Sequence, residues 1–158
     1  MKERYLDQII KYSDRVNVTR LRISADRLQK ELGRYNKIAK EDRLCSWCKL
    51  VLGVETIEDE EHFLQYCDLN ATPGRNIYHK IRSLTTNTPH TTTTTSAPVS
   101  HTQNIPQSIN YLKFISNNSE LSDSLINESQ VHLKRMIAGF VTTCIKNRNK
   151  FIDSLPKS

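Results

Sequence analysis

The hydrophobic positions of this chain recur mainly at helical spacing, which predicts a mostly α-helical protein. The first example lies near the N-terminus, where apolar side chains follow one another at intervals of four, three and four residues. These intervals place them on one face of a single helix. The residues on this face are Tyr5, Ile9, Tyr12 and Val16.

A second helix is predicted to begin near Ser24. Asp26 then adds a negative charge to its first turn, where the helix dipole favours an anion. Leu28 and Leu32 form the apolar side of this helix, and Gly33 is a suitable residue to end it.

A third helix follows the cysteine-rich segment. Thr72 is a good N-cap, and Pro73 fits the first helical position, which needs no backbone N–H. Ile77, Ile81 and Leu84 then repeat at intervals of four and three residues, which indicates one buried face.

The clearest helix is predicted near the C-terminus. It begins with a capping-box pair, Asn127 and Gln130, and Lys146, Arg148 and Lys150 lie in its last turn, where the helix dipole favours cations. We expect its apolar stripe to pack back on the N-terminal helices. The stripe consists of Leu133, Met136, Ile137, Phe140, Val141 and Cys144.

Threonine, serine, proline and asparagine dominate residues 85–108. Such a composition buries too little apolar surface to offset the entropy of ordering, so we expect a disordered Thr-rich insertion there. The chain is therefore predicted to comprise a helical zinc-binding module (residues 1–84), this linker, and C-terminal helices (residues 109–155) that pack on the module.

Charge is unevenly distributed along the sequence. The net charge is +6, made up of +5 in residues 1–44, −4 in residues 45–67 and +5 in residues 68–158. Basic flanks suit contact with the phosphates of nucleic acid, although a solvated surface rich in lysine and arginine gives the same count. Hydrophobic residues make up only 37% of the chain, which indicates a small core.

No stretch of the sequence has the pattern of a secretory signal or a membrane span. The N-terminus is charged within its first four residues, and no apolar run approaches the ~20 residues that a spanning helix needs. We therefore expect an intracellular protein, nuclear or cytoplasmic, without membrane contact. In a reducing compartment, clustered cysteines indicate metal binding rather than disulfides.

The cysteine-rich segment carries the strongest chemical signal. Cys45, Cys48, His62 and Cys67 follow a C-x₂-C-x₁₃-H-x₄-C spacing. Three thiolates and one imidazole suit one tetrahedral Zn²⁺, and four protein ligands are typical of a structural site rather than a catalytic one. We expect a short β-hairpin between the two ligand pairs, with its turn at Gly53, and then a short helix that carries His62.

Other residues of this kind are interpreted differently. Two cysteines at C-x₂-C spacing can also occur by chance, because buried free cysteines are common. Cys144 lies on the apolar stripe of the last helix, where we interpret it as a packing residue. The remaining histidines lack a second ligand at metal spacing, and only His79 is a possible substitute ligand. The acidic run from Glu58 to Glu61 is interpreted as the first turn of the zinc helix.

The stretches LRISADRLQKELGRYN, RLCSWC and IEDEEHFLQYC, followed by a helix with Arg75 and Ile81, resemble the C-terminal zinc-binding region of non-LTR retrotransposon reverse transcriptases and their relatives. The matching residues are Leu21, Arg22, Ile23, Ser24, Ala25, Gly33, Arg34, Tyr35, Arg43, Cys45, Cys48, Ile57, Glu58, Asp59, Glu60, His62, Phe63, Leu64 and Cys67. The resemblance implies a structural zinc-binding module that grips RNA or DNA.

The paired carboxylates of a polymerase are missing, because the chain has no YxDD-type motif to hold two metal ions. We therefore expect no enzyme activity. Two alternatives to nucleic-acid binding stay open: a zinc-stabilised protein-interaction module, and a retroelement-derived remnant without retained activity. Trp47 either stacks on a base or covers the zinc turn. The side chains that we expect to contact nucleic acid are Arg20, Arg22, Arg27, Lys30, Arg34, Lys37 and Trp47.

Overall fold

The computed structural model describes residues 5–85 and 127–156, which fold mostly into helices, as predicted. The predicted linker except for residue 85, and residues 109–126 of the predicted C-terminal segment, lie outside this part of the chain. The α-helices are α1 (Tyr5–Gln8), α2 (Tyr12–Arg22), α3 (Gln29–Tyr35), α4 (Ala71–Thr85) and α7 (Asn127–Ser154). Single turns of 3₁₀-helix, η1 (Lys40–Asp42) and η4 (Asp68–Asn70), and of π-helix, η2 (Cys48–Leu52) and η3 (His62–Tyr66), lie between them.

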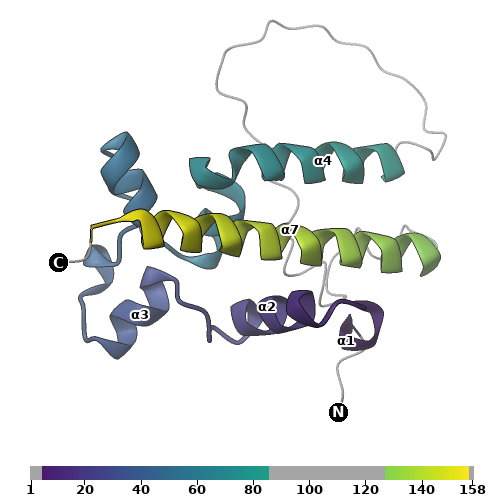
Figure 1. The fold of residues 1–158 in the computed structure, drawn as a ribbon, viewed down its shortest axis with the longest axis horizontal. Helices are drawn as coiled ribbons and strands as arrows, with labels where there is room; N and C mark the ends of the chain where they lie inside the picture. The colour runs from purple at the N-terminus through teal and green to yellow at the C-terminus, as the bar shows by residue number, and fades with distance from the viewer. Residues whose placement is uncertain (1–4, 86–126, 157–158) are drawn as a thin grey trace, which may run out of the picture.

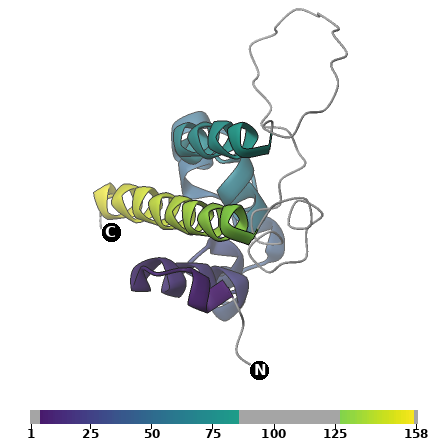
Figure 2. The ribbon, with the colours of Figure 1, turned by 90° about the vertical axis from the view of Figure 1, so that its right-hand side faces the viewer.

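The long helix α7 lies at the centre of the molecule. Helix α4 runs along one side of it, and α1 and α2 lie along the other side (Figures 1 and 2). The short turns η3 and η4 pack against its C-terminal half. The helices α1, α2 and α4 thus pack mainly against α7, which is the last of the described helices in the sequence.

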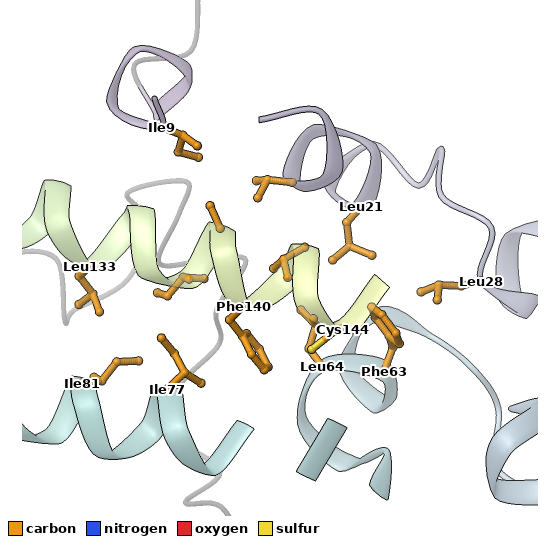
Figure 3. Packing of buried hydrophobic residues seen from close by; sticks show 14 residues of the cluster. Ile9, Leu21, Leu28, Phe63, Leu64, Ile77, Ile81, Leu133, Phe140 and Cys144 are labelled. Carbon is orange, nitrogen blue, oxygen red and sulfur yellow. The ribbon is translucent and has the colours of Figure 1, made fainter. Parts of the chain in front are cut away.

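The apolar stripe predicted for α7 forms the centre of the core. Leu133, Ile137, Val141 and Cys144 are fully buried, and Met136 is partly buried at the edge. Figure 3 shows the side chains of α4 facing this helix from one side and those of α2 from the other. The residues that pack around α7 are Ile9, Val18, Leu21, Leu28, Phe63, Leu64, Ile77 and Ile81.

The prediction of one continuous helix at the N-terminus is wrong. Helix α1 ends at Gln8, and α2 begins after Lys11, whose backbone is extended with φ −74° and ψ 122°. This break changes which face is buried, because Ile9 is in the core whereas Tyr12 is 73% exposed. The buried side of α2 instead contains Val18 and Leu21.

The second helix begins later than predicted, at Gln29. Ser24 adopts a positive φ of 51°, which ends the helical backbone conformation after α2, and α3 begins only at Gln29. Asp26 lies before the helix, where its Oδ1 accepts a hydrogen bond from the backbone N–H of Leu28 at 2.8 Å. The helix also continues past Gly33 to Tyr35, so the glycine does not end it.

Gly33 has a packing role instead. A Cβ at this position would lie only 2.5 Å from Cγ of Arg43. The Arg43 side chain is held in place by hydrogen bonds to the backbone oxygens of Ile38 and Lys30. The close approach therefore requires a residue without a side chain.

Two helix ends also differ from the prediction. Helix α4 begins at Ala71, so Thr72 and Pro73 lie within its first turn rather than at the cap and the first position. Helix α7 continues to Ser154, beyond the three cations that we placed in its last turn. One of these cations, Arg148, is buried, which gives it a different role from the one predicted.

The predicted β-hairpin is not formed in the described residues. Only an isolated antiparallel bridge joins Leu44 to Ile57, and the intervening residues coil into η2. This π-helical turn occupies Cys48–Leu52, where the first strand of the hairpin was expected. Gly53 does adopt a turn conformation, because it follows the last residue of η2 in the left-handed region with φ 68°. None of the described helices is long and apolar enough to cross a membrane.

Candidate metal centre

Cys45, Cys48, His62 and Cys67, here called the CCHC cluster, come together beside the C-terminal half of α7. All four residues are buried, and their ligand atoms lie within 4.8 Å of one another. Cys45 precedes η2 and Cys48 begins it, whereas His62 begins η3 and Cys67 follows its last residue. The structure thus brings together the four side chains that the spacing predicted, in a cluster that could bind a metal ion.

The distances within the CCHC cluster fit a tetrahedral zinc site. Sγ of Cys45 lies 3.8 Å from Sγ of Cys67, and Sγ of Cys48 lies 3.4 Å from Nε2 of His62. Bond lengths of about 2.3 Å to sulfur and about 2.0 Å to nitrogen give edges of about 3.8 Å and about 3.5 Å in a regular tetrahedron. A disulfide needs sulfurs about 2.05 Å apart, so the thiols are free.

The backbone positions these ligands through two π-helical turns. Cys48 begins η2 and His62 begins η3. In each turn a backbone N–H five residues later returns to the ligand's carbonyl oxygen: Gly53 donates to Cys48, and Cys67 donates to His62 at 2.7 Å. The wider π turn brings Cys67 back beside the imidazole of His62. Single π turns are rare in proteins and are often found at functional sites.

The thiols of the CCHC cluster influence one another's ionisation. A hydrogen bond from Cys67 lowers the pKa of Cys45 well below that of a free thiol. The hydrogen bond to Cys45 and then burial raise the pKa of Cys67, and burial raises the pKa of Cys48 to about 11. On their own, the three thiols therefore favour a single thiolate. A divalent cation would favour all three thiolates, because its charge offsets both the burial and the mutual repulsion.

The acidic run before His62 divides into separate roles, of which only one was predicted. Asp59 caps η3, since its Oδ1 accepts the backbone N–H of His62 at 2.8 Å. Glu60 pairs with Lys30 at 2.7 Å and accepts a hydrogen bond from Ser24. Glu58, the first residue of the run, is buried and points away from solvent.

Glu58 forms a buried ion pair with Arg148 of α7. Nε and Nη2 of Arg148 donate to the two carboxylate oxygens at 2.7 and 2.8 Å, and the backbone N–H of Gln29 donates to Oε2 at 2.7 Å. The pair joins the segment before the CCHC cluster to the last helix. The pair was not predicted from the sequence, although Arg148 continues the buried stripe at an interval of four residues from Cys144.

The basic side chains predicted to contact nucleic acid are not equally available. Lys30 is bound to Glu60, and Arg34 pairs with Glu31 at 2.8 Å. Arg22 is half-buried and also interacts within the chain. Arg20, Arg27, Arg34 and Lys37 are exposed, and Arg34 is the one of these four whose side chain pairs with a carboxylate among the described residues.

Trp47 lies between two of the metal ligands and is half-buried. Its ring meets Phe151 of α7 edge to face, with ring centroids 4.9 Å apart. Its indole nitrogen is buried and has no hydrogen-bond partner in the described part of the chain. Of the two alternatives for Trp47, these contacts favour the one in which the ring covers the turn that carries Cys45 and Cys48.

The other candidate ligands lie away from the CCHC cluster. Cys144 is fully buried in the core, and burial raises the pKa of its thiol strongly. His79 is exposed on α4 beside Tyr78, and His132 is exposed on α7. The remaining two histidines lie outside the described residues.

Comparisons of this chain with protein-family models, curated proteins and solved structures find no match.

Proposed function

We propose that the CCHC cluster binds one Zn²⁺ and that this ion has a structural role. The observation that carries the proposal is the convergence of four buried ligand atoms at distances close to the edges of a zinc tetrahedron. Four protein donors complete the coordination of zinc and leave no position for water or substrate. We therefore propose a binding module rather than an enzyme.

Zinc would stabilise the segment that carries few core residues of its own. Between Cys45 and Cys67, only Phe63 and Leu64 belong to the main apolar core. Structural zinc contributes about 10–16 kcal/mol of binding free energy in small zinc peptides, most of which is folding free energy. A contribution of this kind would hold η2 and η3 against α7.

Metal analysis of the purified full chain tests this proposal. We expect close to one zinc per chain, and with Co²⁺ in its place the absorption of a tetrahedral thiolate site. Cys45→Ser should lose the metal. Cys144→Ser is the matched control. The Cys144 thiol lies in the core, away from the CCHC cluster, so this substitution should leave the zinc content unchanged. Full zinc retention by the Cys45 variant would refute the assignment.

We further propose that the module binds nucleic acid, as the tail of a retroelement reverse transcriptase without its polymerase would. The exposed arginines Arg20 and Arg27, the basic flanks and the resemblance of residues 15–83 support this role. Affinity for single-stranded RNA and duplex DNA at two salt concentrations tests it. Each phosphate contact should contribute about −0.7 to −0.9 to the slope of log affinity against log salt.

One observation supports the alternative of a protein-interaction module. Leu50, Val51, Leu52 and Val54 are exposed together around η2. Contiguous exposed apolar side chains often mark protein contacts. If neither RNA nor DNA binds at about 50 mM salt, where phosphate contacts are only weakly screened, the interaction module replaces the nucleic-acid proposal.

A further inference from the structure

A pocket of about 190 Å³ opens between α2, η3 and the C-terminal half of α7. Leu21, Leu28 and Phe63 lie buried at its base, and Ala25 and Ile145 keep exposed apolar surface in its lining. The volume is several times the ~30 Å³ that one liquid water occupies, so the pocket can admit a group larger than solvent. Phe63 follows the metal ligand His62 directly, so the CCHC cluster helps to position one wall.

Two uncommitted arginines lie at the edge of this pocket. Arg20 and Arg27 are exposed, and neither guanidinium makes a hydrogen bond or an ion pair within the part of the chain that the structure describes. Other cations of the same region are engaged: Lys30 and Arg34 pair with carboxylates, and Arg148 is bound to Glu58. A planar guanidinium recognises phosphate by paired hydrogen bonds.

The pocket wall also contains an acceptor without a partner. Oδ2 of Asp26 is buried and receives no hydrogen bond, whereas Oδ1 accepts the backbone N–H of Leu28. A buried acceptor without a partner costs free energy, and an N–H group brought into the pocket would relieve that cost after a small rotation of the carboxyl group. The site therefore offers cations for an anion, apolar surface for a ring and an acceptor for an N–H.

We propose that this pocket seats one nucleotide of a single-stranded nucleic acid, with its phosphate at Arg20 and Arg27 and its base against Ala25 and Ile145. The inference rests on the proposed nucleic-acid binding and assigns it a location. A nucleotide combines all three features that the pocket complements: a phosphate, a flat apolar ring face and base N–H groups. A duplex cannot use the pocket in this way, because its bases are paired and stacked.

The test measures binding of the zinc-loaded full chain to a short labelled single strand, in RNA and DNA forms. Arg20→Ala/Arg27→Ala should weaken binding at least tenfold and reduce the salt slope by about 1.4, since each lost phosphate contact on a single strand contributes about 0.7. The matched control is Lys11→Ala/Lys80→Ala, which removes the same charge from a second groove between α2, α4 and α7. The control should change affinity by less than about threefold, because exposed charges at a distance are screened.

A strand with abasic sites separates the base from the phosphate. It retains every phosphate, so a seat for a base predicts roughly tenfold weaker binding of the abasic strand, from a stacking contribution of about 1–3 kcal/mol per base. Asn149→Trp provides a second variant, because Asn149 is exposed and lines the pocket, and a large ring there should block it without disturbing the core. A free mononucleotide that displaces the strand at micromolar concentration would identify a small-molecule nucleotide site instead.

Several results would overturn the inference. Equal weakening by the arginine and lysine pairs, or equal affinity for the normal and abasic strands, would mean that the wild-type protein binds nucleic acid without this pocket. Unchanged binding by Asn149→Trp would lead to the same conclusion. If the wild-type protein itself binds neither RNA nor DNA, the proposed nucleic-acid function fails and the pocket assignment fails with it. Zinc content and melting temperature of each variant confirm that it is folded.

Discussion

Replacing Arg148 with methionine should destabilise the protein far more than its position near the end of α7 suggests. Both side chains of the Glu58–Arg148 pair are nearly inaccessible, with 4% and 9% exposure. Without the guanidinium, the buried Glu58 carboxylate keeps only one strong donor, the backbone N–H of Gln29. Breaking a buried pair in this way costs about 3–5 kcal/mol, because one charge stays in a medium of low dielectric constant.

This cost is large relative to the stability of a small domain, which is typically about 5–15 kcal/mol. The loss should lower the melting temperature on the order of 10 °C or more. Urea unfolding of the zinc-saturated protein measures the free energy directly, provided that the slope m stays unchanged. Lys150→Met is the control, since Lys150 is exposed on the same helix and should change stability by less than about 0.5 kcal/mol.

The double variant Glu58→Gln/Arg148→Met shows whether the cost comes from an unpaired charge. It removes both charges, and the amide oxygen can still accept the N–H of Gln29. We expect it to be more stable than Arg148→Met alone, because no buried carboxylate is left without a counter-ion. A loss below about 1 kcal/mol in the single variant, or a loss in the double variant equal to the sum of the two single losses, would refute this reasoning.

Three further predictions concern other sites. Burial, followed by repulsion from Glu60, raises the pKa of Asp26, so the folded state binds this proton more tightly than the unfolded state does. Asp26→Asn should therefore raise the free energy of unfolding at pH 7. Urea unfolding at several pH values should show this gain disappearing as the pH falls toward 3.8, the ordinary pKa of an aspartate. Gly33→Ala should lower the free energy of unfolding by about 1–3 kcal/mol despite the better helix propensity of alanine, because Arg43 must shift and lose its hydrogen bonds to Ile38 and Lys30. An unchanged melting temperature would contradict this. Thr142→Val should lower the free energy of unfolding by about 1–3 kcal/mol, because Thr142 donates a 2.8 Å hydrogen bond to the buried carboxylate of Asp14. Chemical denaturation measures this loss, and an unchanged free energy of unfolding would mean that water replaces the hydroxyl.

Features that depend on short sequence spacing were the most predictable from the sequence. The CCHC cluster was expected because two thiols three residues apart converge within one turn, and because His62 and Cys67 are separated by a single turn of helix. The buried stripe of α7 was expected for a similar reason, since its period follows directly from helix geometry.

Features that depend on contacts between distant residues could not be predicted. Nothing near Arg148 in the sequence shows that it meets Glu58, which lies 90 residues earlier. A charged residue at a stripe position could only be interpreted as a surface group near a helix end. The break at Lys11 is of the same kind, because α1 and α2 pack separately against α7 and neither follows the register of a continuous helix.

The hairpin predicted between the two ligand pairs failed because the residues after Cys48 continue as a π-helical turn instead of a strand. This turn takes up Cys48–Leu52 and ends at Gly53, whose positive φ of 68° was the one part of the predicted turn that the structure retains. Only the bridge from Leu44 to Ile57 pairs the two sides of this segment in the described residues.

The central position of α7 sets an order of events during synthesis. All four residues of the CCHC cluster have been made by residue 67, whereas α7 begins only at Asn127. The nascent chain can therefore complete the CCHC cluster while the apolar faces of α2 and α4 still have no helix to cover them. A chain that stops before α7 would retain all four residues of the CCHC cluster and lose the centre of its core, which makes it a candidate for chaperone binding and aggregation.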